Sequence, residues 1–142
     1  MATQKGSYVT SALLNVLRGT AFPAVPAGFY LALFTTMPTK SDGTGAVEVS
    51  GGSYARVALS PVAGTWAAPA LQADNVTELI SNAAAINFTT ATANWGTILG
   101  VGIYDASTVG NLWLYGTLAT SVLVNSGTPF SFAIGALTPH DS

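Results

Sequence analysis

The strongest constraint on the fold of this chain is an unbroken run of six apolar residues, Phe29-Tyr30-Leu31-Ala32-Leu33-Phe34. A strand with one face in water alternates apolar and polar residues, whereas a strand covered on both faces reads as a continuous apolar run. The run is far shorter than the roughly 20 apolar residues that a membrane-spanning helix needs. We therefore predict a strand whose two faces are both buried by other parts of the chain.

The residues after this run predict a loop at 37–46. The loop is polar, and it contains Pro38 and the pair Asp42-Gly43, which favours a tight turn. An aspartate in such a turn usually accepts hydrogen bonds from the nearby backbone, so a structural role is favoured over a chemical one. The loop is predicted to project from the domain, and Pro38 and Asp42 are predicted to contact a neighbouring protein.

A second strand is predicted to follow Gly51-Gly52 and to end at Leu59. It carries Arg56, one of only 4 basic residues in the chain, and Glu48 lies on the other side of the double glycine. Arg56 is expected to be either solvated or paired. A pair formed across two copies of the chain would be largely desolvated and costly to break, so Arg56 is included among the predicted interface residues.

One helix is predicted near the N-terminus, at 7–18. Ser7 is in position to cap it, and Gly19 stands where helices commonly end. The apolar residues that share one face at helical spacing are Val9, Leu13, Val16 and Leu17. This stripe must pack against the domain's own sheet or against a neighbouring copy, and Leu13 and Leu17 are predicted interface residues.

The rest of the chain reads as short strands separated by turns rich in Gly, Pro, Asn and Ser, about eight strands in all. Together with the single helix, this pattern predicts an all-β fold, either a β-sandwich or a jelly roll. Two glycines inside one predicted strand, Gly100 and Gly102, indicate a bulge or a close backbone approach. We predict a single domain, 1–142, made of an N-terminal arm, helix and proline-containing connector (1–28), a β-sandwich (29–135) and a polar tail (136–142).

The charge content limits the possible partners. Asp, Glu, Lys and Arg make up 7% of the residues and the net charge is −2, whereas about 25% is usual for soluble domains. A chain without a basic surface is not expected to bind nucleic acid or to attach electrostatically to a membrane. So few charges predict that partners cover much of the surface, although a surface of Thr, Ser, Asn and Gly is the alternative.

The chain offers few groups for chemistry. It has no cysteine, which excludes disulfides, thiolate metal sites and cysteine nucleophiles. The only histidine, His140, lies close to the end of the sequence, where a general base is not expected to be held in fixed geometry. The acidic residues do not show calcium-loop spacing. We therefore predict no catalytic, metal or cofactor site, and the chain is not expected to be an enzyme.

The tryptophans leave several alternatives open. Trp113 falls within a strand pattern and is predicted to be core. Trp66 and Trp95 lie in predicted loops, where a tryptophan is a core residue, an anchor at a protein interface or a platform on which a sugar stacks. Both are included among the predicted interface residues.

Several segments, in this order and spacing, resemble a group of small tailed-phage virion proteins over roughly residues 7–134. They are the apolar strand with Thr35-Thr36, Gly51-Gly52-Ser53-Tyr54-Ala55-Arg56-Val57, Asn94-Trp95-Gly96, Ile103-Tyr104-Asp105-Ala106, and Gly110-Asn111-Leu112 followed by Tyr115-Gly116. Such proteins include capsid decoration (cement) proteins and tail-fibre proteins. The resemblance implies a non-enzymatic virion component, often a homotrimer, and it carries no catalytic residues.

Two functions follow from this resemblance. The first is a capsid decoration protein that binds the major capsid protein on the outer shell and bridges capsomers as a homotrimer, because three weak contacts in one rigid unit gain avidity. The alternative is a tail-fibre or receptor-binding domain that recognises the host surface. In both cases the protein is expected in the virion, after assembly in the host cytoplasm.

Overall fold

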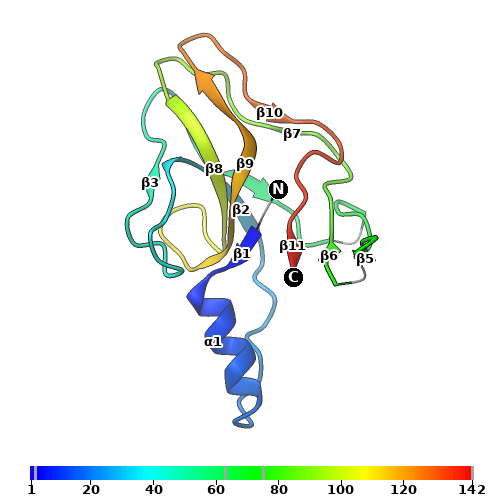
Figure 1. Cartoon of the computed structure of the whole chain (residues 1–142). Helices are drawn as coiled ribbons and strands as arrows, with labels where there is room; N and C mark the ends of the chain where they lie inside the picture. Colours follow the sequence, from blue (N-terminus) through cyan, green and yellow to red (C-terminus); the bar gives the residue numbers. More distant parts are fainter. Residues whose placement is uncertain (2, 63, 75, 142) are drawn as a thin grey trace.

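The computed structural model describes residues 1, 3–62, 64–74 and 76–141. This part of the chain forms three antiparallel sheets and one N-terminal helix, which projects from one end of the molecule (Figure 1). The elements are β1 (Thr3–Lys5), α1 (Ser7–Val16), β2 (Phe29–Thr36), β3 (Val47–Glu48), β4 (Val57–Leu59), β5 (Ala70–Leu71), β6 (Glu78–Leu79), β7 (Ile86–Asn87), β8 (Gly96–Tyr104), β9 (Leu112–Val124), β10 (Ser131–Phe132) and β11 (His140–Asp141). The predicted all-β class with one N-terminal helix is confirmed. Several strands are only two residues long, so more strands form than the eight that the turn pattern suggested.

The largest sheet has the order β1-β9-β8-β2-β3, and β4 pairs with β2 as well. β2 pairs with β8 along Tyr30–Phe34, while its other edge is shared by β4 at one end and β3 at the other. The two smaller sheets are β10-β7 and β11-β6-β5. The apolar run therefore lies in the middle of the main sheet, as its composition predicts.

Both faces of β2 are buried, which confirms the prediction for this strand. Leu31 and Leu33 point into the larger core, which the aromatic and aliphatic residues of the β7 and β10 region close from the other side. Ala32 and Phe34 point into a second, smaller cluster with Leu112 and Tyr115. The side chains from Leu31 to Phe34 have no exposed surface.

The two glycines of β8 allow this second cluster to pack. A Cβ atom at Gly102 would lie 2.6 Å from Cζ of Phe34, and one at Gly100 would collide with the thioether of Met37. The prediction of a close approach at these glycines is therefore confirmed. The Phe34 ring occupies the space that a side chain at 102 would need.

Both ends of the described chain are paired, in contrast to the predicted arm and tail. β1 adds to the edge of β9, with Gln4 opposite Tyr115, and β11 pairs with β6, with His140 opposite Leu79. Sheet edges carry unpaired N–H and C=O groups that any extended backbone can satisfy, whatever its side chains. Polar composition alone therefore did not identify these strands, and Ser142 lies outside the described residues.

The helix is shorter than predicted and its N-cap differs. It ends at Val16, so Arg18 lies in the turn beyond it, and Gly19 follows with φ +80° in the left-handed region. Gly6 occupies the N-cap without a side-chain hydrogen bond, and a Cβ there would collide with the carbonyl of Leu112. Close packing against β9 therefore requires glycine at the N-cap, which is residue 6. The sequence had predicted Ser7 as the N-cap. No helix in the described residues is long and apolar enough to span a membrane.

Candidate functional site

Arg56 is enclosed by its own chain. Its Nη2 and Nε donate to the Glu48 carboxylate at 2.7 and 2.8 Å, and its Nη1 donates to the carbonyls of Ala106 and Val109 at 2.9 and 2.8 Å. The guanidinium lies 3.7 Å from the centre of the Tyr104 ring, and the Arg56 side chain is only 7% exposed. The charge is thus paired within one subunit, which leaves it no free face for a second copy.

Tyr54 connects this ion pair to the central strand. Its hydroxyl donates to Oε1 of Glu48 at 2.9 Å and accepts from the backbone N–H of Leu33, also at 2.9 Å. Burial raises the pKa of Tyr54 well above its usual value. The group formed by Glu48, Tyr54 and Arg56 ties β2, β3 and the start of β4 together, so its role is architectural.

The loop at 37–46 folds back rather than projecting freely. Asp42 accepts from the backbone N–H of Thr44 at 2.8 Å, and hydrogen bonds from Thr44 lower the pKa of Asp42. Ser41 accepts through its carbonyl from the backbone N–H of Ser7, at 2.8 Å, which fastens the loop to the start of α1. Asp42 is exposed and Pro38 is half-buried. Asp42 therefore has the structural role in its turn that the sequence predicted. The loop does not project freely, as was predicted, but is bonded to the start of the helix.

Trp95 belongs to the larger core. Its side chain is 5% exposed and packs at right angles against Tyr54 and Phe88. The indole N–H donates to the carbonyl of Gly52 at 3.0 Å, so the double glycine closes over the ring. Trp95 is therefore not available to a partner or to a sugar, which removes it from the predicted interface residues.

The other two tryptophans line an open apolar groove of about 670 Å³ between the main sheet and the β11-β6-β5 sheet. The lining residues are Phe29, Pro61, Val62, Gly64, Trp66, Ala67, Ala68, Pro69, Ile80, Ile103, Trp113, Leu114 and Pro139. Trp66 and Trp113 are both half-buried, so part of each ring faces the groove. Trp66 is retained as a predicted interface residue, and Trp113 is less enclosed than its strand pattern suggested.

A second hollow, of about 340 Å³, continues the groove toward the helix. It shares Trp113 and Pro139 with the first, and it adds Val9 and Leu13 of α1. Lys5, Glu78 and His140 lie at its rim. We call this groove, its extension and the exposed side of α1 the apolar strip.

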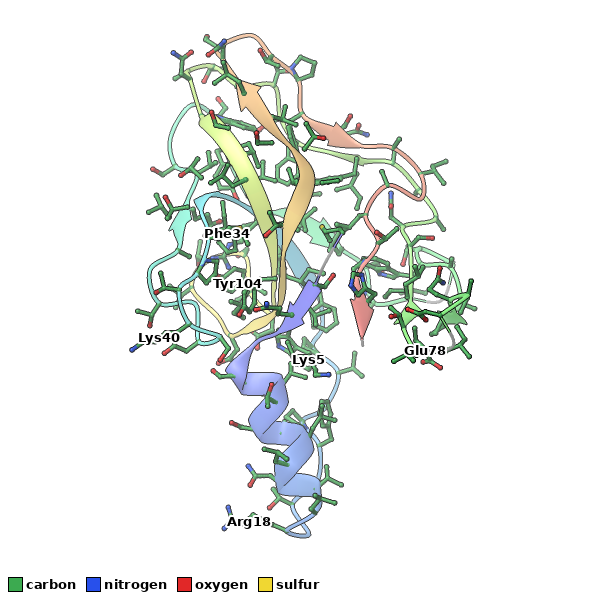
Figure 2. The ribbon with its side chains drawn as sticks, in the orientation of Figure 1. Lys5, Arg18, Phe34, Lys40, Glu78 and Tyr104 are labelled. Carbon is green, nitrogen blue, oxygen red and sulfur yellow. The ribbon has the colours of Figure 1, made fainter. Side chains whose placement is uncertain are left out.

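The helix contributes exposed leucines to the apolar strip. Val9 and Ala12 are its only buried side chains, whereas Leu13 is 46% and Leu17 is 86% exposed. α1 extends away from the sheets, with Arg18 at its far end (Figures 1 and 2). The leucines predicted as interface residues from helical spacing are therefore on the surface, next to a groove that the sequence did not reveal.

Trp113 is held in place from two sides. Its ring lies 5.0 Å from that of Phe29 and 5.5 Å from that of Tyr8, and its indole N–H donates to Asp105 at 3.2 Å. Burial alone would raise the pKa of Asp105, but hydrogen bonds from Asn111 and from the Trp113 indole outweigh it and leave this pKa below its usual value. The wall of the groove is thus pre-organised.

The chemistry of the apolar strip favours burial of apolar side chains. Within the described residues, no three His, Asp or Glu side chains are grouped so as to hold a metal ion. Protein interfaces are often anchored by tryptophan, and their centres bury apolar side chains. The apolar strip offers both kinds of group, in Trp66, in Trp113 and in the exposed leucines. The sequence missed this site because its walls come from segments far apart in the chain, and none of them has a distinctive pattern by itself.

Comparison with known protein families identifies the family to which the chain is similar. A family model described as Podophage GP4 fiber I protein gp80 matches residues 4–140. The match runs from β1 to β11 and therefore includes both sides of the apolar strip. No curated protein matches the chain.

Proposed function

The chain belongs to the podophage GP4 fiber I protein gp80 family, a family of tailed-phage virion structural proteins, and from this premise we propose that it is a structural subunit of a virion fibre. The observation that carries the proposal is the extent of the match, residues 4–140, which covers nearly all of this sequence. The resemblance to tailed-phage virion proteins seen in the sequence is confirmed, and so is the expected place of the protein in the virion.

A fibre subunit works by binding, and the apolar strip supports this kind of role. The strip offers aromatic and aliphatic groups to a partner chain, whereas the buried ion pair of Glu48 and Arg56 serves the fold. We propose a non-enzymatic protein that requires no cofactor, assembles with copies of itself as a homotrimer and joins the tail. Repeated weak contacts in one rigid assembly raise the effective concentration and can increase avidity by about 10²- to 10⁴-fold.

The capsid decoration function is less well supported than the fibre function. The matched family is described as a fibre protein, and nothing in that description refers to the capsid shell. The fibre alternative, which the sequence also suggested, fits this description better. Host-surface recognition by such a fibre would have to use residues other than Trp95, because that ring is enclosed in the core.

Location and copy number on intact virions test the proposal. We expect gold-labelled antibodies against this chain to mark the tail, and quantitative mass spectrometry to find few copies relative to the major capsid protein. Virions that lack the chain, labelled in the same way, are the control. Dense labelling over the whole head, with copies in the hundreds, would instead establish the decoration function and overturn the fibre proposal.

A further inference from the structure

Few side chains of the projecting helix are buried within its own chain. An isolated helix of fewer than about 12–15 residues is marginal in water, and α1 has 10 residues, of which only Val9 and Ala12 are buried. Leu13 and Leu17, four residues apart, lie on one face with Val9. This face adjoins the groove, since Val9 and Leu13 also line its extension. The helix therefore presents an apolar edge that lacks a covering layer.

The chain exposes more surface than is usual for a compact monomer of its mass. The chain exposes 7605 Å², whereas a compact monomer of 14.4 kDa exposes about 6,800 Å². The excess of about 800 Å² equals the area that one partner contributes to a standard protein interface.

The charges around the apolar strip favour a second copy of this chain over a strongly charged partner. The extension of the groove is lined by Lys5 and Glu78, whose charges are opposite, so its lining matches neither a polyanion nor a polycation. The turn just beyond the helix carries the exposed Arg18, and Glu78 is exposed on β6 (Figure 2). One copy thus supplies a leucine-bearing helix tip with a cation, and another supplies an apolar groove with a carboxylate beside it.

We propose that α1 of one copy docks in the groove of another, with Leu13 and Leu17 against Trp66 and Trp113 and with Arg18 beside Glu78 of the receiving copy. The contact joins the helix tip of one copy to the groove of the next, and repeating it gives a closed ring when the rotation between copies closes, as the proposed homotrimer requires. In this arrangement, the groove of each copy is filled by Leu13 and Leu17 of the neighbouring copy. This inference deepens the fibre function and rests on it for its biological setting, but the contact can be tested on the purified chain without reference to its place in the virion.

Cross-linking between engineered cysteines tests the contact directly. The natural chain has no cysteine, so a short bismaleimide can join only the cysteines that are introduced. We expect chains with Leu17→Cys, coexpressed with chains carrying Ala68→Cys, to give a cross-linked pair containing one chain of each kind. Ala68 is an exposed residue of the groove wall, and its replacement is small. Mass spectrometry of the linked peptides identifies the two positions.

Matched combinations make the result decisive. Ala119→Cys, an exposed position on β9 outside the apolar strip, replaces Ala68→Cys as the control and is expected to give no cross-link with Leu17→Cys. A dominant cross-link between two Leu17→Cys chains would show that helices pair with each other, and it would overturn the proposal. A wild-type chain that sediments as a monomer would overturn it as well, whatever antibody labelling of virions finds.

Charge reversal tests the register of the docked helix. We expect Arg18→Glu and Glu78→Arg each to weaken self-association about five- to tenfold in sedimentation equilibrium, since each places like charges together, and the double variant to recover most of the loss. Both side chains are exposed, so circular dichroism is expected to show an unchanged fold in all three variants. If the single reversals have no effect, or if the double variant is weaker than either, the proposed docking is wrong.

Discussion

The tryptophans of this chain lie in two opposite environments. Around Trp95, the rings of Tyr54 and Phe88 pack edge-on and the indole N–H is satisfied by Gly52, all within one subunit. Around Trp66 and Trp113, the walls are also apolar, but they stand apart as an open groove. The first region is complete in a single chain, and we propose that the second is completed by another copy.

The same contrast separates the two arginines. Arg56 forms four hydrogen bonds with groups of its own subunit and stacks on Tyr104. Arg18 is exposed and its guanidinium bonds to the side-chain oxygen of Asn15, one turn back along the helix, at 3.2 Å. In a chain with so few charges, this difference indicates which side of the molecule maintains the fold and which side is available to a partner.

The largest effect is expected where the closed tryptophan is removed. Trp95→Ala leaves a cavity in the core and removes one of the two hydrogen bonds that the Gly52 carbonyl accepts, the other coming from the backbone N–H of Thr92. We expect it to lower the free energy of unfolding by about 3–5 kcal/mol. Trp66→Ala removes a half-buried ring at the groove, so the expected loss is about 1 kcal/mol. Urea denaturation of both variants, measured on dilute protein, makes the comparison.

Association should respond in the reverse order. Trp66→Ala is expected to weaken self-association about tenfold, because a ring that faces the groove is lost at the proposed interface. Folded Trp95→Ala, in conditions where it remains native, is expected to associate as the wild type does. Equal effects of the two substitutions on both properties would remove the distinction between the two regions.

The second prediction compares the arginines. Arg56→Ala leaves the Glu48 carboxylate without its cation and removes the donor to the carbonyls of Ala106 and Val109. We expect a loss of about 3 kcal/mol in the free energy of unfolding. The lower end of the usual range applies because the Glu48 side chain keeps 26% of its surface in water. Arg18→Ala is the matched control, and its expected effect on unfolding is below about 0.5 kcal/mol. A similar loss of unfolding free energy in both variants would contradict the claim that the enclosed Arg56 stabilises the fold.

The sequence predicted those features that a short stretch of residues encodes by itself. The run from Phe29 to Phe34 is a local signal, so the buried strand could be predicted with both of its faces covered. Gly100 and Gly102 are similar, because a glycine inside a strand usually marks a bulge or a close backbone approach. Leu13 and Leu17 were identified by helical spacing. Each of these inferences uses neighbours within one or two turns of the chain.

The groove and the edge strands could not be predicted in this way. Trp66, Ile80, Trp113 and Pro139 line one space only after the main sheet and the β11-β6-β5 sheet have come together. Trp95 was assigned to a loop, and only the fold of Gly51-Gly52 across it makes the ring part of the core. Burial at these positions is decided by tertiary contacts between distant segments, and neither propensity nor periodicity encodes them.

The third prediction tests how tightly the closed side is packed. Gly102→Ala places a Cβ atom against the ring of Phe34, and we expect a loss of about 1–3 kcal/mol in the free energy of unfolding from overpacking. Gly28→Ala is the control, since a Cβ there meets nothing closer than 3.6 Å. Chemical denaturation measures both. If Gly102→Ala is as stable as the control, the second cluster is looser than its geometry indicates.

The smallest effect is expected at the boundary between the two regions, where Asp105 holds Trp113. The pKa of this carboxyl is lowered in the folded chain, so its contribution to stability is present above the unfolded value of about 3.9 and is lost as the pH falls through the lower, folded value. The carboxyl is largely in water, so screening limits the expected contribution to about 1 kcal/mol or less.

Asp105→Asn separates this contribution from those of other acids. The pKa of Asp42 is also lowered, and that of Asp74 falls to about 2, so the wild type loses stability in acid for several reasons. We expect the difference in unfolding free energy between wild type and Asp105→Asn to be largest near neutral pH and to shrink below about pH 4. A difference that does not change between about pH 6 and pH 3, measured by urea denaturation, would mean that the charge of Asp105 does not stabilise the Trp113 wall. The position of Trp113 would then depend on its packing against Phe29 and Tyr8 and not on the charge of Asp105.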